Sequence, residues 1–292
     1  MINYKEKLTT DRELNSYSDI DISIESDRGR IFSSAAFRRL QKRTQVFALE
    51  LNASIRSRLT HSLEVAQNAR YIARTILDEL KKNDLKTYGL EDMENAFIST
   101  SEMTSLIHDI GNPPFGHFAE ETINKWLKNN VVQKLESFKS STKEIEDLKN
   151  ILRNDICHYD GNAQAIRIIT KLQRLNLSYF QIIAVLKYTR GAFENKPDNS
   201  DSLNYLKKKP GFYYSEKDLV EKIQTCSKIV KIFGEEIAVK AEIEDLDAFS
   251  GHADRDGLLE FIDKMKNKPH NIFINHGEIV IQQVLKTYIT EK

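Results

Sequence analysis

Two imidazoles and a carboxylate in this chain have types that suit metal binding. The doublet His108-Asp109 and the more distant His61 offer nitrogen and oxygen ligands. Such ligands bind divalent metals of the series Mn, Mg, Fe, Ni, Co and Zn. The only cysteines, Cys157 and Cys226, lack the spacing of a thiolate metal site or a disulfide framework. The sequence therefore predicts a divalent-metal site with mixed nitrogen and oxygen ligands.

A second grouping lies just downstream, where His117 and Glu120 stand three residues apart. On a helix, this spacing places two side chains on one face, one turn apart. A carboxylate in that position can orient the imidazole and raise its basicity, as general acid/base catalysis requires. The pair is a candidate catalytic dyad, and the alternative is an ordinary surface ion pair at a helix start.

The elements that must position these residues are mainly helical. The 292 residues include only 11 Gly and 5 Pro, and apolar residues recur at helical spacing from about residue 31 to 223. Residues 110–116, rich in Gly and Pro, should end one helix and let the backbone pass close to a ligand. Residues 195–209 read as a polar loop. Helices are expected near residues 28–45, 60–81, 93–109, 117–128, 143–154, 161–174, 178–188 and 215–225.

After about residue 226 the pattern changes to β alternation, with a hairpin expected over residues 229–243. A helix near 256–266, a short strand near 271–275 and a final helix near 279–289 complete this part. The expected fold class is mainly α, with a small C-terminal α/β appendage. The expected domains are residues 1–226 and 227–292.

The charge balance and the hydropathy of the sequence argue against two classes of partner, polyanions and membranes. The 43 basic and 43 acidic residues cancel, which argues against a general polyanion-binding surface and requires any phosphate affinity to come from a local cluster. Neither a signal-peptide core nor an apolar run of the roughly 20 residues needed to span a bilayer is present. The expected location is the cytoplasm.

Several motifs in order along the first 225 residues resemble the dGTPase family of HD-domain deoxynucleoside triphosphate triphosphohydrolases. They occupy residues 27–47 (DRGRIFSSAAFRRLQKRTQVF), 58–65, 108–120 (HDIGNPPFGHFAE), 158–164 (HYDGNAQ), 175–179, 187–188 and 209–218 (KPGFYYSEKD). The resemblance implies a helical HD fold, a homo-oligomer, and hydrolysis of a deoxynucleoside triphosphate to deoxynucleoside and inorganic triphosphate.

The resemblance also implies roles for particular side chains. The metal ligands would be His61, His108 and Asp109, and the catalytic dyad near the α-phosphate would be His117 with Glu120. The substrate-binding residues would be Gln45 and Arg58 for deoxyribose and phosphate, with Lys187 and Lys209 for the triphosphate. A metal and cationic side chains suit this reaction because they offset charge that develops on phosphoryl oxygens.

The chain departs from this family after residue 218. Family members close the metal site with a second Asp on a later helix, and residues 229–292 contain no such segment. Loss of an anionic ligand would weaken metal binding. A fourth ligand could come from Asp245, Asp247 or another chain.

The C-terminal segment has a resemblance of its own. Residues 247–255 (DAFSGHADR) and 272–278 (IFINHGE) are similar to the C-terminal motifs of β-CASP metallo-β-lactamase ribonucleases and their RNA-specificity segment. This resemblance implies that His276 corresponds to a zinc ligand and that His252 corresponds to a residue near the scissile phosphate. The defining His-x-His-x-Asp-His motif of that family is absent from the sequence.

Three functions are consistent with these patterns. The first is a metal-dependent dNTP triphosphohydrolase. The second is a catalytically impaired nucleotide-binding or regulatory subunit. The third is a nucleic-acid-binding module that uses the C-terminal segment, which the neutral net charge does not favour.

The C-terminal segment should hold no zinc site of its own. Zinc in proteins normally has three or four protein ligands, and His252 and His276 supply two. Replacing both histidines with Ala should leave the metal content of the purified protein unchanged, as measured by elemental analysis. Loss of one zinc per chain would show that the segment completes a site with ligands from elsewhere.

Overall fold

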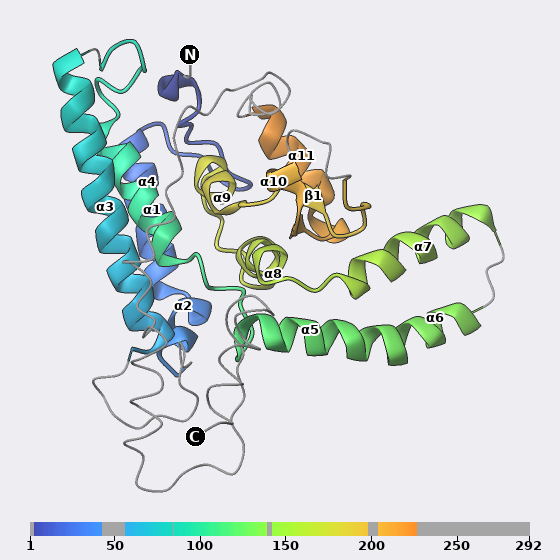
Figure 1. The fold of residues 1–292 in the computed structure, drawn as a ribbon. Helices are drawn as coiled ribbons and strands as arrows, with labels where there is room; N and C mark the ends of the chain where they lie inside the picture. Colours follow the sequence, from blue (N-terminus) through green and yellow to red (C-terminus); the bar gives the residue numbers. More distant parts are fainter. Residues whose placement is uncertain (1–2, 43–55, 84, 139–141, 198–203, 227–292) are drawn as a thin grey trace, which may run out of the picture.

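The computed structural model describes residues 3–42, 56–83, 85–138, 142–197 and 204–226 of the chain, and these are mainly helical (Figure 1). The α-helices are α1 (Ile20–Ser33), α2 (Ala35–Arg39), α3 (Arg58–Asn83), α4 (Glu94–Leu106), α5 (Gly116–Leu127), α6 (Gln133–Ser137), α7 (Lys143–Cys157), α8 (Gly161–Arg167), α9 (Tyr179–Val185), α10 (Asn204–Lys207) and α11 (Lys217–Cys226). Strands β1 (Arg190–Gly191) and β2 (Pro210–Phe212) pair in parallel.

Helix α4 is central to the helical layer, since it packs against α3, α1 and α9. Helix α8 lies against β2 and α9. Helices α5 and α6, joined by a π-helical segment over Lys128–Val132, form a long arm with α7 that extends away from the rest of the molecule (Figure 1). The loop between α4 and α5 therefore lies where the helical layer, α8 and the arm meet.

The largest apolar core joins these elements. It includes Ile31 of α1, Leu106 of α4 and Ile166 of α8, each at most 1% exposed. Burial of such side chains contributes roughly 1.5–3 kcal/mol each to folding. Helices α3 and α4, in or next to which the predicted metal ligands lie, thus share one core with α8.

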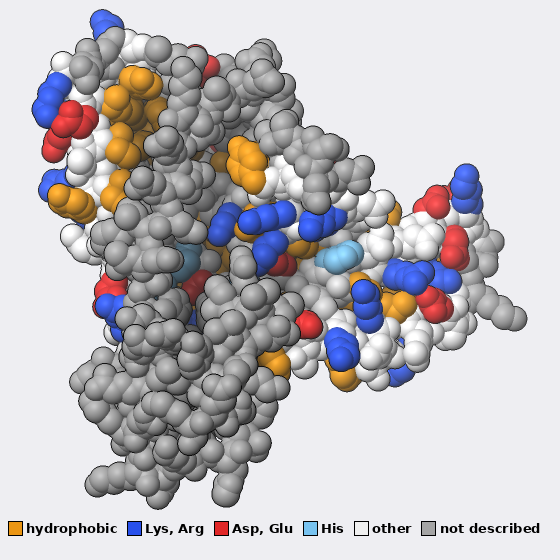
Figure 2. All heavy atoms as spheres, in the orientation of Figure 1, with side chains coloured by type: hydrophobic (Ala, Val, Ile, Leu, Met, Phe, Trp, Pro, Cys, Tyr) orange, Lys and Arg blue, Asp and Glu red, His pale blue; other side chains and the backbone are white. Residues whose placement is uncertain are grey.

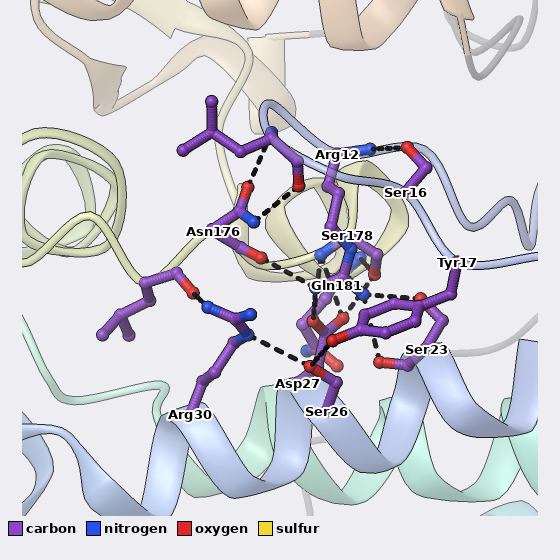
Figure 3. A network of polar contacts seen from close by, with 12 residues as sticks. Arg12, Ser16, Tyr17, Ser23, Ser26, Asp27, Arg30, Asn176, Ser178 and Gln181 are labelled. Atoms are coloured by element: carbon purple, nitrogen blue, oxygen red, sulfur yellow. Dashed lines mark hydrogen bonds and ion pairs between the residues drawn. The ribbon is translucent and has the colours of Figure 1, made fainter.

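A buried polar network ties the N-terminal segment to this core (Figure 3). Arg12 forms an ion pair with Asp27 of α1 at 3.1 Å, and both side chains are at most 2% exposed. The hydroxyl and backbone amide of Ser178, which precedes α9, donate hydrogen bonds to Asp27 at 2.6 and 3.0 Å. Burial raises the pKa of Asp27 above its ordinary value, although Ser178 and Arg12 oppose that shift.

The expectation of a mainly α fold is confirmed, and the expected C-terminal α/β appendage lies outside the described residues. Six expected helices correspond closely to α3, α4, α5, α7, α9 and α11. The expected helix over 161–174 is α8 followed by a π-helical segment over Ile168–Leu172. None of the helices in the described ranges has both the length and the apolar character needed to cross a membrane.

The single helix expected over residues 28–45 is wrong. Helix α1 starts earlier, at a cap where the side chain of Asp19 accepts from the amide of Ile22. Ser34 then adopts an extended conformation, and its hydroxyl accepts from the amide of Phe37 to begin α2. The apolar periodicity continues through this break, so it does not reveal the change of helix. The two short parallel strands were also missed. They lie on either side of the loop expected over residues 195–209, and strands of two or three residues are too short to show a periodicity.

The buried ion pair gives a test of the fold. Replacing Asp27 with Ala leaves the Arg12 guanidinium buried without its carboxylate, and the free energy of unfolding should fall by about 3–5 kcal/mol. Glu25→Ala removes an exposed carboxylate from the same helix and should change it by less than about 0.5 kcal/mol. Urea unfolding measures both, and equal effects in the two variants would contradict this account.

Candidate active site

The three predicted metal ligands lie together. His61 stands in the first turns of α3, while His108 and Asp109 directly follow α4. One ligand atom from each lies within 4.8 Å of the others. Because α3 and α4 pack along their lengths, the group depends on the contact between these two helices.

Neighbouring groups orient the ligand atoms. His108 Nδ1 lies 2.7 Å from the carbonyl oxygen of Ser105, which can only accept, so Nδ1 carries the proton and Nε2 keeps its lone pair. That Nε2 lies 3.4 Å from Asp109 Oδ1. The side-chain amide of Asn112 donates to Asp109 Oδ1 at 2.6 Å. Two imidazoles and one carboxylate in this arrangement fit a divalent metal ion.

No fourth His, Cys, Asp or Glu joins this group within the part of the chain that the structure describes. Asp245 and Asp247, suggested from the sequence as additional ligands, lie outside the described residues. A catalytic metal site with three protein ligands leaves a position open to water or substrate.

The loop after Asp109 folds tightly against α8. A Cβ atom on Gly111 would lie 2.0 Å from the carbonyl oxygen of Gly161 and 2.3 Å from the amide nitrogen of Ala165. Glycine is therefore required at position 111 by the backbone of α8. At Gly111 the loop passes close to the backbone of helix α8. Phe115 and Gly116 then take left-handed conformations, with φ of 67° and 53°, where α5 begins.

His117 and Glu120 form the expected pair in the first turn of α5. His117 Nδ1 lies 2.5 Å from Glu120 Oε2, and the Gly161 amide donates to Glu120 Oε1 at 2.8 Å. The Glu120 side chain is 9% exposed and that of His117 is 63% exposed. Burial alone would raise the pKa of Glu120, but the hydrogen bonds from His117 and Gly161 hold it below its ordinary value. The buried carboxylate thus fixes an accessible imidazole.

Two of the predicted substrate-binding residues contact this site. Arg58, at the start of α3, is buried with its Nη1 3.8 Å from Asp109 Oδ2, and its Nη2 donates to the Pro113 carbonyl at 3.3 Å. Lys209 Nζ lies 3.5 Å from His117 Nε2.

The other two are not joined to the site by a described contact. Lys187 is exposed, with its ammonium 5.6 Å from the Tyr188 ring. Gln45 lies outside the described residues. On the face seen in Figure 2, lysine and arginine side chains gather between two patches of histidine. This arrangement gives a local cationic surface on a chain whose charges cancel overall.

Sequence reasoning missed two residues that support the metal group and the dyad, namely Asn112 and Gly161. Both lie inside the motifs 108–120 and 158–164, so their presence there was the available signal. The pairing of Gly161 with Glu120, 41 residues away in the sequence, follows from the packing of α8 on the loop between α4 and α5.

Comparison with known families gives two matches on this chain. Residues 58–188 match the HD domain family. Residues 236–292 match the family described as the RNA specificity domain of Zn-dependent metallo-hydrolases. Both resemblances inferred from the motifs are thereby confirmed.

Curated relatives agree with the first match. The chain is 46% identical over 233 residues to a probable deoxyguanosinetriphosphate triphosphohydrolase of Pseudomonas aeruginosa, covering 76% of this chain and 47% of the relative. It is 43% identical over 240 residues to the deoxyguanosinetriphosphate triphosphohydrolase of Salmonella typhimurium, covering 76% and 47%. The corresponding enzyme of Yersinia enterocolitica is 43% identical over 245 residues. The chain spans about half the length of these relatives.

The approach at Gly111 gives a test of how the site is held. Gly111→Ala places a methyl group against backbone atoms of α8 that cannot move independently, so the free energy of unfolding should fall by about 1–3 kcal/mol or more. Gly29→Ala meets nothing within 4 Å in α1 and should be neutral or stabilising by up to about 1 kcal/mol. Thermal and urea unfolding measure both, and a fully stable Gly111→Ala protein would contradict the described packing.

Proposed function

We propose that this chain, whose helical part carries an HD domain related to deoxyguanosinetriphosphate triphosphohydrolases, hydrolyses deoxynucleoside triphosphates. The products would be a deoxynucleoside and inorganic triphosphate. The observation that carries the proposal is the grouping of a His-His-Asp metal site and a His-Glu pair at the two ends of one short loop. Phosphoryl chemistry needs charge compensation and a positioned proton donor or acceptor, and these two groups supply them.

In this proposal His117 is the acid/base residue. Its Nδ1–H donates to Glu120, so its Nε2 is the atom that exchanges a proton with the reacting phosphate ester. Glu120 is a positioning residue, because it is buried and held by the Gly161 amide. The exposed imidazole can then meet substrate without losing its orientation.

The triphosphate would lie along the cationic surface. The Lys209 ammonium lies 3.5 Å from His117 Nε2, and the Arg58 guanidinium lies 3.8 Å from the Asp109 carboxylate. Lys187 and Gln45 complete the proposed substrate contacts on the strength of the motifs. The positive charges of Arg58, Lys187 and Lys209 would compensate the negative charge of the phosphates.

The metal would be held by His61, His108 and Asp109. Two imidazole ligands favour Mn, Fe, Ni, Co or Zn over Mg, which prefers oxygen ligands. A bound divalent ion at such a site supplies Lewis-acid stabilisation of charge on phosphoryl oxygens. Arg58 and Asn112 would hold the Asp109 carboxylate in place from outside the ligand set.

We also propose a division of the chain into a helical unit over residues 1–226 and a separate C-terminal unit over 227–292. The two family matches fall on either side of this boundary. A homo-oligomer in the cytoplasm and a contact of the C-terminal unit with nucleic acid belong to the same proposal.

A catalytically impaired nucleotide-binding subunit is the alternative. It is favoured by the count of three protein ligands in the described residues. The alternative predicts that the protein binds dNTPs and releases no triphosphate, whatever divalent metal is supplied.

The metal site is tested by replacing its carboxylate. Asp109→Ala removes the one anionic ligand of the group and should strongly lower the metal content per chain, measured by elemental analysis of purified protein. Asp92→Ala, an exposed carboxylate before α4, should leave the content unchanged. Undiminished metal in Asp109→Ala would rule out this site.

The acid/base role is tested by triphosphate release from each of the four dNTPs. His117→Ala should reduce the rate by about 100-fold or more, the scale of losing a positioned acid/base group. Phe118→Ala, an exposed neighbour on the same helix turn, should retain activity. Full activity of His117→Ala would make that histidine structural, and no release by the unmodified protein would favour the alternative.

A further inference from the structure

An ion pair between Lys209 and Asp160 lies beside the proposed dyad. Lys209 Nζ is 3.5 Å from His117 Nε2 and 4.0 Å from Asp160 Oδ2. Together with the hydrogen bond from His117 to Glu120, these contacts form one series of polar contacts that runs Glu120, His117, Lys209, Asp160. Its four members come from α5, the turn before β2 and the start of α8.

The direction of the hydrogen bonds in this series is determined by chemistry. An ammonium has three donors and no acceptor, so Lys209 donates and His117 Nε2 accepts. The proton of the ring is then on Nδ1 and is donated to Glu120. The arrangement therefore describes a neutral imidazole whose proposed reactive atom is covered by Lys209.

Asp160 is buried and held by hydrogen bonds, whereas the Lys209 side chain is partly exposed. It caps α8, with Oδ1 accepting from the amide and the side chain of Asn162 at 2.9 and 2.7 Å. Its backbone amide also donates to the Tyr213 hydroxyl at 3.3 Å, and the residue is 6% exposed. The Lys209 side chain is 34% exposed. A buried, capped carboxylate can thus determine where a flexible ammonium resides.

Other groups near Asp160 do not replace Lys209. The Arg190 guanidinium of β1 donates to the carbonyl oxygens of Lys207 and Glu194 at 2.8 and 2.7 Å. Tyr188 and Tyr213 also lie near Asp160, and burial raises the pKa of each, so both stay neutral at physiological pH. Among the described residues, Lys209 is the cation that forms an ion pair with Asp160.

We infer that Asp160 is a positioning residue that holds the Lys209 ammonium on His117 Nε2 until an anionic phosphate takes the ammonium away. This inference rests on the proposed function for the identity of the anion. When a triphosphate binds, Lys209 turns to its oxygens while staying near Asp160, and His117 Nε2 becomes free to accept or deliver a proton. Lys209 thereby couples phosphate binding to exposure of the acid/base atom.

The test uses the full chain in the absence of substrate, labelled with ¹⁵N-histidine, with the ring signals of His117 identified by their loss in His117→Asn. Asp160→Asn keeps a side-chain oxygen that can cap α8 and removes the charge. The Nε2 signal of His117 should shift in Asp160→Asn and in Lys209→Met, because the donor leaves the nitrogen. Lys208→Met and Asp147→Asn, which change exposed residues of the same types, should leave it in place.

Inorganic triphosphate serves as the binding probe in a second measurement. Lys209→Met should weaken its binding by about tenfold, because the ammonium that turns to the phosphate is lost, whereas Asp160→Asn removes a neighbouring negative charge and should not weaken it. If Asp160→Asn does not fold, Asp160→Ser keeps a capping hydroxyl and takes its place in both measurements.

The outcomes separate this inference from the proposed function. A His117 signal that shifts in Lys209→Met and stays unchanged in Asp160→Asn overturns the role of Asp160. A signal unchanged in both overturns the whole contact. Absence of triphosphate release from the unmodified protein overturns the proposed activity, while the spectra of the unliganded protein still decide whether Asp160 positions Lys209.

Discussion

The described structure depends on one close approach, in which the loop after α4 presses against the first turn of α8. Gly111 and Gly161 permit this approach, because a Cβ atom on either residue would overlap atoms of the opposing segment. Asn112 within this loop orients Asp109, and the Gly161 amide holds Glu120. The same contact therefore supports both the candidate metal group and the candidate dyad.

The supporting side chains are buried, whereas the side chains proposed to react are partly exposed. The supporting groups are enclosed, as with the ion pair of Arg12 and Asp27 in the core and the 9% exposure of the Glu120 side chain. The groups proposed to meet substrate, His117 and Lys209, are partly open to solvent. Enclosed partners fix orientation at low entropic cost to the exposed groups, which can then respond to an anion.

The chain joins two family matches, and the candidate site lies in the helical one. Three candidate metal ligands come from α3 and from the residues after α4. Lysine and arginine side chains also gather on one face, so part of the surface is positively charged although the chain has 43 basic and 43 acidic residues.

The sequence by itself determined the helical fold class, the types of ligand and the pairing of His117 with Glu120. Each depends on local spacing, because apolar periodicity and the i, i+3 relation act within one helix. The tertiary structure decided the need for glycine at position 111 and the place of Asp160 beside Lys209. These features depend on contacts between segments far apart in the chain, where sequence spacing carries no information about distance.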